Sequence, residues 1–274
     1  MGGLRAHALL VWERYFPHRI YSLDSTSPFH SPRYLIPLDL RNVPQYRFDA
    51  VVVGSGAAGS TAALEAARLG TSVALLSKAF LEDSNTMLAK GGMAAVLGED
   101  DSIASHVQDT LRVGCDLSDP DVVEAVVSRG PAAVQALLAM GAELDRDASG
   151  ELELAKEGGH SRHRIVHAGV DATGREIQSC LVRSVRACEG ISSFEQVFAI
   201  DLLSTPEGNV AGVLCSTERR ELVVFQARQI VLATGGAGQI YRETSNHVIA
   251  TADGGARAVG GREGKRMDSR PVRQ

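Results

Sequence analysis

Short apolar runs alternate with glycine turns and helical patterns along most of the chain, which is typical of an α/β fold. The clearest run covers residues 50–53, where Ala50 precedes three valines. An alanine-rich helical segment follows over residues 60–69, and a second apolar run covers residues 71–77. Strand, helix and strand in this order predict a βαβ unit in a parallel sheet.

The rest of the chain adds helices and strands around this unit. Residues 102–141 have helical patterns with breaks at Gly114, at Asp119 and Pro120, and at Gly130 and Pro131. The apolar positions over residues 122–127 and 134–138 fit two amphipathic helices, which we assign to core packing. Residues 173–185 predict another helix. Four further strands are predicted over residues 192–203, 210–217, 221–227 and 229–236, the last of them buried and parallel.

Both ends of the chain lack these patterns. Residues 1–46 are punctuated by five prolines, and we expect an N-terminal extension there, either loosely ordered or an overlong start. Residues 255–274 are rich in basic side chains and have little apolar periodicity, which indicates a divergent tail. The main domain is therefore expected over residues 47–254.

Composition narrows the class of protein. The chain has 274 residues, 44% of them hydrophobic, so it can bury a core. A net charge of −5 gives no reason to expect a nucleic-acid partner. Four widely spaced cysteines do not predict disulfides, and no apolar run approaches a membrane span. The apolar start ends at Glu13, too early for a signal peptide, so we expect a cytoplasmic enzyme without a membrane partner.

A glycine fingerprint, GSGAAG, joins the first strand to its helix at residues 54–59. In such a turn Gly54 supplies the backbone angles, Gly56 lets a pyrophosphate approach the main chain, and Gly59 lets helix and strand pack closely. The helix N-terminus then favours the phosphates, so we expect a dinucleotide site rather than an ordinary glycine turn. Ser77 and Lys78 stand where an acidic ribose contact is usual, which weakens a plain NAD interpretation.

Three histidines follow one another at spacings of three and four: His160, His163 and His167. On a helix this spacing would place them on one face, as metal ligands are placed. Arg162 and Arg164 add positive charge, which opposes a dication and suits a carboxylate, so we predict no metal.

The motifs GSGAAG, LLSK and SNTMLAKGGMAAV, in this order, resemble the succinate dehydrogenase and fumarate reductase flavoprotein superfamily, and within it the L-aspartate oxidases. Later segments resemble the same pattern, among them EGGHS at residues 157–161 and LATGGAGQIY at residues 232–241. The resemblance covers residues 33–254. It implies a Rossmann-like FAD-binding domain with a parallel sheet plus added β-strands. The capping and C-terminal helical domains of the family are expected to be absent, through a truncated or frame-shifted gene or in a naturally short homologue.

The resemblance implies FAD rather than NAD as the cofactor. A histidine carries a covalent flavin link in the succinate-oxidising relatives, and Asn85 stands at its position, so the FAD is expected to be noncovalent. Lys90 replaces a usual glutamine and either lies near the flavin's pyrimidine edge or points to solvent. The expected cofactor-binding residues are Gly54, Ser55, Gly56, Ala57, Ala58, Gly59, Ser77, Lys78, Asn85, Thr86, Ala89, Lys90, Gly91, Gly92, Val197, Gly235 and Asp253.

The same resemblance implies the chemistry. The EGGHS segment lies against a dicarboxylate in the family, which makes Glu157 and His160 the expected catalytic residues, with Glu157 reading the ammonium group of L-aspartate. A solvated loop glutamate is the alternative for Glu157. The implied reaction is oxidation of L-aspartate to iminoaspartate with oxygen or fumarate as acceptor. This is the first step of de novo NAD biosynthesis, with quinolinate synthase as an expected downstream partner. A fumarate reductase or succinate dehydrogenase type flavoprotein and an inactive flavin-binding fragment stay open as alternatives.

Overall fold

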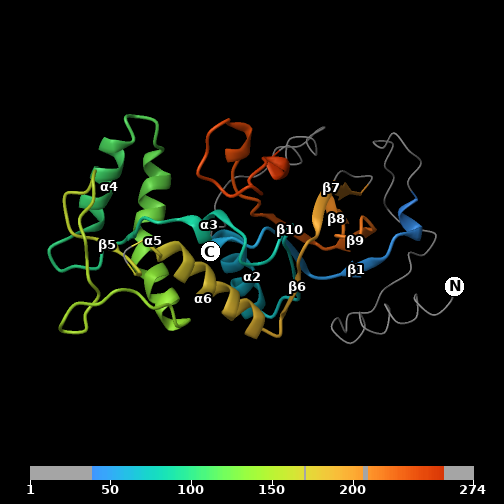
Figure 1. The fold of residues 1–274 in the computed structure, drawn as a ribbon, viewed down its shortest axis with the longest axis horizontal. Coiled ribbons are helices and arrows are strands. Elements are labelled where there is room, and N and C mark those ends of the chain that lie inside the picture. The colour runs from blue at the N-terminus through green and yellow to red at the C-terminus, as the bar shows by residue number, and fades with distance from the viewer. Residues whose placement is uncertain (1–38, 170, 206–208, 256–274) are drawn as a thin grey trace. The chain divides into compact units, whose positions relative to one another are not determined.

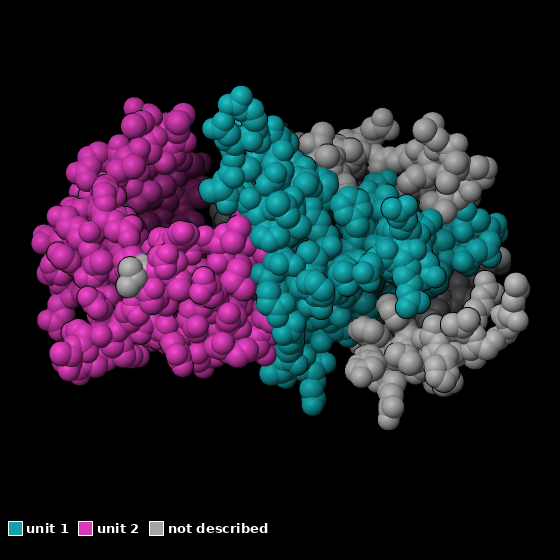
Figure 2. Space-filling model, in the orientation of Figure 1, with its two compact units in different colours: residues 1–83, 185–274 teal, residues 84–184 magenta. Residues whose placement is uncertain are grey.

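The computed structural model describes residues 39–169, 171–205 and 209–255. The predictions for residues 1–38, for the turn at residues 206–208 and for residues 256–274 lie outside the described residues. Two compact units divide the chain: unit 1 comprises residues 1–83 and 185–274, and unit 2 comprises residues 84–184 (Figure 2).

Unit 1 contains a four-stranded parallel sheet in the order β10-β2-β3-β6. Its two edge strands, β10 and β6, are labelled in Figure 1. Helix α2, Ala57–Arg68, connects β2 to β3 and packs against both strands, which confirms the predicted βαβ unit. All four residues of β2 and all four of β3 are buried, as the continuous apolar runs require. The strands are β2 Ala50–Val53, β3 Val73–Leu76, β6 Ile191–Phe194 and β10 Gln229–Leu232, followed by the short 3-10 helix η2 Gly238–Ile240.

A second sheet in unit 1 has the order β1-β9-β8-β7. Strand β8, Val210–Ser216, is antiparallel to both β7, Phe198–Ser204, and β9, Leu222–Gln226, which confirms the added β-strands. Strand β1, Gln45–Arg47, joins β9 in parallel, after the 3-10 helix η1, Leu40–Asn42. These residues of the expected extension fold because Tyr46 is buried there, its ring stacked on Phe225 at 5.4 Å.

The single strand predicted over residues 192–203 is wrong. The segment forms two strands, β6 and β7, which belong to different sheets. Gln196 lies between them with a positive φ of 55°, and its N–H donates to the Ala79 carbonyl at 3.1 Å. Apolar alternation continues through this turn, so the pattern alone does not show the change of sheet.

Unit 2 is built mainly from helices. Its core joins α5 to the two-stranded antiparallel sheet β4-β5 through Ala95, Val134, Leu144, Val166 and Ala168. Its elements are α3 Asn85–Leu88, β4 Met93–Ala94, α4 Ile103–Val113, α5 Pro120–Ala139 and β5 Ile165–Val166, and α6 Thr173–Ala187 begins in it.

The two helices predicted over residues 120–139 are one continuous helix, α5, with Pro131 inside it. The predicted break at Pro131 is wrong. Val127, Val134 and Leu137 form one buried face that continues across the proline. This packing outweighs the loss of the helix hydrogen bond that a backbone N–H at position 131 would donate. By length and composition α5 could cross a membrane, a test that core helices of water-soluble proteins also pass.

Candidate functional site

The glycine turn after β2 is shaped by backbone contacts that exclude any side chain. Gly54 has φ of +112°, and a Cβ there would lie 2.2 Å from the Ala233 carbonyl oxygen. A Cβ at Gly59 would lie 1.8 Å from the Gly54 carbonyl oxygen. These are the geometries expected of the first and third glycine of a dinucleotide fingerprint.

The N-terminus of α2 follows this turn directly. Gly56 is its N-cap, and within the described part of the chain no side chain caps the helix. The hydroxyl of Ser55 is used elsewhere, donating to Ser77 Oγ at 2.9 Å, and Ser60 Oγ donates to the Ser55 carbonyl at 2.8 Å. A helix N-terminus that follows a glycine turn directly fits the phosphates of a dinucleotide.

Residues far apart in sequence meet at the carboxyl ends of β3 and β10. Lys78 Nζ lies 2.7 Å from Asp253 Oδ1 and 2.9 Å from Thr251 Oγ1. Gly254 packs so closely on Thr234 that a Cβ at Gly254 would lie 1.9 Å from the Thr234 hydroxyl. The structure therefore joins Lys78 and Asp253, two expected cofactor contacts, in one ion pair at the edge of the sheet where ligands of such folds bind.

Two other expected contacts of unit 1 lie near these strand ends. The N–H of Val197 donates to the Ser77 carbonyl at 2.9 Å, so this amide is already engaged within the protein. Gly235 has φ of +73°, and a Cβ there would meet no atom within 4 Å. The space beside Gly235 is open, as close approach of a ligand to the main chain requires.

In unit 2 the expected flavin loop over residues 85–92 packs closely at both ends. At its start, a Cβ at Gly174 would lie 2.0 Å from the Thr86 carbonyl oxygen, and the Gly174 N–H donates to Ala89 at 3.0 Å. At its end, a Cβ at Gly92 would lie 2.2 Å from Ile165. Ser84 caps α3, which carries Asn85, by accepting from the Met87 N–H, so the loop is fixed on both sides of its middle.

The middle of this loop faces solvent. A Cβ at Gly91 would meet no atom within 4 Å. Lys90 is 80% exposed, and its Nζ lies 3.9 Å from Asp171 Oδ2. Such an exposed pair contributes little to stability, so Lys90 is a surface cation with freedom to reorient.

The three histidines of the next segment each have a different partner. His167 Nε2 lies 2.8 Å from Glu157 Oε1, whereas His163 Nδ1 lies 3.2 Å from the Leu154 carbonyl. His160 Nδ1 lies 3.4 Å from Arg164 Nη1. Because residues 157–167 do not form a helix, their spacing does not align the histidines on one face. Among the described residues, no group of three or more metal-binding side chains occurs.

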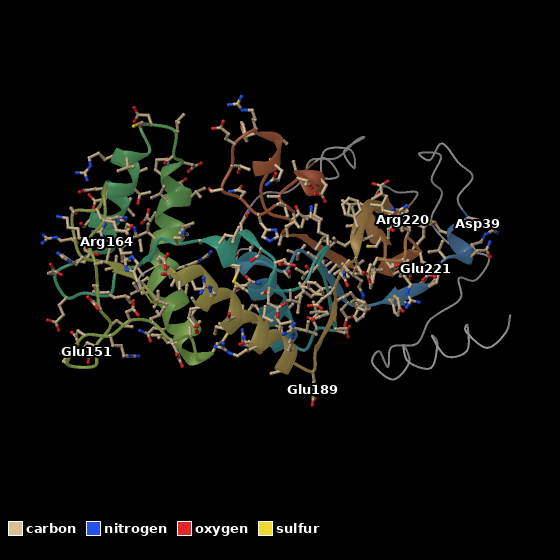
Figure 3. All side chains as sticks on the ribbon, viewed as in Figure 1. Asp39, Glu151, Arg164, Glu189, Arg220 and Glu221 are labelled. Carbon is tan, nitrogen blue, oxygen red and sulfur yellow. The ribbon has the colours of Figure 1, made fainter. Side chains whose placement is uncertain are left out.

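The side chain of Arg164 is fully buried, which corrects the expectation that its positive charge is offered to a carboxylate substrate. Its Nε lies 2.7 Å from Asp101 Oδ2 and its Nη1 lies 2.8 Å from Asp109 Oδ2 (Figure 3). Asp109 Oδ2 also accepts from the N–H and the hydroxyl of Ser161, each at 2.7 Å. The hydrogen bonds from Ser161, and then Arg164, hold the pKa of Asp109 well below its usual value. This cluster ties the EGGHS segment to α4.

His106 borders the same cluster. Its side chain is buried, and its ring lies 5.5 Å from the His160 ring. Burial, followed by the charges of Arg164 and His160, lowers the pKa of His106, against the opposing carboxylates of Asp101 and Asp109.

We therefore predict that the free energy of unfolding falls as the pH drops from about 7 to about 5. Below the ordinary histidine pKa of about 6.5, His106 binds a proton in the unfolded chain, whereas the folded chain disfavours the protonated form because the pKa of His106 is lowered there. Acid therefore stabilises the unfolded state relative to the folded state. Denaturant titrations across this range measure the slope, which His106→Leu should reduce. The matched control is His163→Leu at an exposed histidine, which should leave the slope nearly unchanged. Equal slopes in the wild type and His106→Leu would contradict the prediction.

The chain matches a family model and is similar in sequence to several known proteins. The model of the FAD binding domain family matches residues 49–271. The chain is 45% identical over 215 residues to an L-aspartate oxidase of Streptomyces coelicolor, covering 77% of this chain and 37% of that protein. It is 44% identical over 217 residues to the chloroplastic L-aspartate oxidase of Arabidopsis thaliana, covering 77% and 33%. The chain thus spans about a third of the length of these curated relatives.

Solved structures show the same fold. A quinol fumarate reductase of E. coli superposes with a TM-score of 0.74 at 32% identity, covering 79% of this chain and 37% of that one. Sdh1 of Mycobacterium smegmatis superposes with a TM-score of 0.75 at 31% identity, covering 79% and 38%.

Proposed function

We propose that this chain, which belongs to the family of FAD-binding domains, is the flavin-binding part of an L-aspartate oxidase. The observation that carries the choice of substrate is Glu157, a half-exposed carboxylate held by His167 in the segment expected to meet a dicarboxylate. A carboxylate is a suitable partner for an ammonium group, which L-aspartate has and succinate lacks. The two named relatives described as L-aspartate oxidases support the same choice.

FAD is proposed to be held noncovalently. In unit 1, Gly54 and Gly59 let the turn pack closely on the backbone, and the turn is proposed to hold the pyrophosphate at the N-terminus of α2. The Lys78–Asp253 pair is proposed to contact the adenosine end. In unit 2, the loop over residues 85–92 is proposed to lie along the flavin. When bound, the flavin supplies the acceptor for the hydride that leaves the Cα–N unit of the substrate. Asn85 has no ring nitrogen with which to form a covalent flavin bond.

The proposed catalytic residues bind and orient the substrate. Glu157 accepts hydrogen bonds from its ammonium group, and His160 is proposed to donate to a carboxylate. Arg164, 3.4 Å from His160 Nδ1, is buried with Asp101 and Asp109, so it holds the His160 segment in place without competing for the substrate. This arrangement would separate recognition of the substrate from the charges that fix the segment.

The proposed activity predicts a selective colour change. Under anaerobic conditions L-aspartate should bleach the visible absorption of the flavin-loaded chain, and succinate should not. Bleaching by succinate alone would favour a fumarate reductase or succinate dehydrogenase type flavoprotein, the second candidate, which the two superposed structures support. Bound flavin that neither compound bleaches would show the chain to be an inactive flavin-binding fragment.

The noncovalent attachment makes a separate prediction. Precipitating the yellow protein with acid should leave the flavin in the supernatant, because Asn85 offers no covalent link. The measurement is the flavin absorbance of the supernatant and of the redissolved pellet. Flavin that remains with the washed pellet would contradict this part of the proposal.

The electron acceptor, the pathway and the downstream partner are proposed from the named L-aspartate oxidases alone. Oxygen or fumarate would reoxidise the flavin, the product iminoaspartate would enter NAD biosynthesis, and quinolinate synthase would be the downstream partner. A cytoplasmic location, and the lack of nucleic-acid and membrane partners, remain predictions. The Arabidopsis thaliana relative is described as chloroplastic, so location varies among the proteins that this chain resembles.

A further inference from the structure

We infer that His167 is the positioning residue that sets the orientation of Glu157 and thereby the preference for an amino dicarboxylate. This inference rests on the proposed function and adds to it a residue outside the expected catalytic pair. His167 follows β5 directly, and Gly92 precedes β4, the antiparallel partner of β5. The pairing brings the end of the loop over residues 85–92 beside the His167 ring.

The contact between this loop and the ring is close. A Cβ at Gly92 would lie 2.7 Å from His167 Nε2, so only glycine leaves the imidazole its observed place. The His167 backbone is also fixed, because its carbonyl accepts from the Asp145 N–H at 2.9 Å. The His167 side chain is 18% exposed, whereas that of Glu157 is 48% exposed. A well-packed ring thus holds a side chain that would otherwise be free to move in a loop.

The hydrogen bond leaves one carboxylate oxygen for a ligand. His167 Nε2 lies 2.8 Å from Oε1 of Glu157. Among the residues that the structure describes, no bond to Oε2 occurs alongside it. With Glu157 ionised, the proton of the bond belongs to Nε2, so the imidazole donates and the carboxylate keeps its capacity to accept. Oε2 is then fixed in direction before the substrate arrives, which lowers the entropic cost of binding an ammonium group.

This arrangement should act on selectivity more than on overall affinity. The ammonium group of L-aspartate needs an oriented acceptor, whereas succinate has no group for Glu157 to recognise. Loss of the His167 donor should therefore weaken binding of L-aspartate and leave binding of succinate almost unchanged. A purely structural role for His167 would weaken both ligands together.

The experiment compares His167→Leu with His167→Gln in the flavin-loaded chain. Dissociation constants for L-aspartate and succinate come from the change in the flavin spectrum as each compound is added anaerobically. We expect His167→Leu to weaken L-aspartate about tenfold, the effect of one charge-assisted hydrogen bond, with succinate changed less than about twofold. His167→Gln places an amide donor near the position of Nε2 and should restore most of the selectivity.

A second measurement does not depend on the proposed function. In nitrogen-15 NMR spectra of the chain, the Nε2–H signal of His167 should be visible because a hydrogen bond slows its exchange, and it should vanish in Glu157→Leu. An unchanged Nε2–H signal in Glu157→Leu, or an unchanged selectivity in a folded His167→Leu, would overturn the inference. If the wild-type chain does not respond to L-aspartate, the proposed function fails, and the NMR result alone still decides whether His167 holds Glu157.

Discussion

Replacing Gly59 with alanine is expected to abolish retention of FAD and to destabilise unit 1. The added Cβ would lie 1.8 Å from the Gly54 carbonyl oxygen and 3.3 Å from the Ala233 Cβ, so α2 must move away from β2. Both contacts involve atoms that cannot rotate aside, and such overpacking costs about 1–3 kcal/mol or more. The movement also widens the turn on which the pyrophosphate is proposed to sit. The measurement is flavin content after gel filtration, together with denaturant unfolding.

The control for this prediction is Gly130→Ala. Gly130 also lies within a helix, α5, but its nearest neighbour would be the Ala95 Cβ at 3.6 Å, an ordinary contact. Alanine is the better helix former, so Gly130→Ala should leave stability unchanged or raise it by about 0.5–1 kcal/mol. Full flavin content in Gly59→Ala would show that the close approach of α2 and β2 is not needed for the cofactor.

Replacing Arg164 with methionine is expected to cause the largest loss of stability in unit 2. The change removes the cation that bridges the buried carboxylates of Asp101 and Asp109. Asp109 keeps Arg112, whose Nη2 lies 2.8 Å from Asp109 Oδ1, but among the described residues Asp101 has no other ion-pair partner. Removing one partner of a buried ion pair typically costs about 3–5 kcal/mol. Loss of the Arg164 bond also weakens the anchor of Ser161, so the EGGHS segment should loosen. Circular dichroism during denaturant unfolding measures the effect.

Arg162→Met is the matched control. Arg162 is half exposed, and its Nη1 lies 3.6 Å from Asp100 Oδ2, an exposed pair whose loss should change stability by less than about 1 kcal/mol. Similar losses in the two variants would contradict the view that burial of the Arg164 cluster, rather than positive charge in this segment, stabilises unit 2.

Much of the fold follows from local signals. The apolar runs of β2 and β3 and the glycines between them predict the βαβ unit, because continuous burial and a glycine turn both leave local signatures in the sequence. The separation of β6 from β7 left none, since strand period is the same in both sheets. The continuity of α5 through Pro131 was likewise decided by packing on one face.

The site was predictable as motifs but not as contacts. The fingerprint glycines have the backbone geometry that their spacing implies. Lys78 and Asp253 were each expected near the cofactor, yet their pairing joins residues 175 apart in sequence. Arg164 is neutralised by Asp109, 55 residues away, and no local pattern shows that an arginine beside glycines is buried. The sequence pattern places His167 only in a row of three histidines. Its contact with Glu157 depends on how the loop between them folds, which the pattern does not show.

The most direct test of the account is an equilibrium titration of the flavin-free chain with FAD in competition with NAD. The central proposal is that the turn over residues 54–59, with the Lys78–Asp253 pair, holds FAD. The account predicts saturable binding of one FAD per chain that excess NAD does not displace. Failure of FAD to bind to the folded chain, or its displacement by NAD, would contradict it.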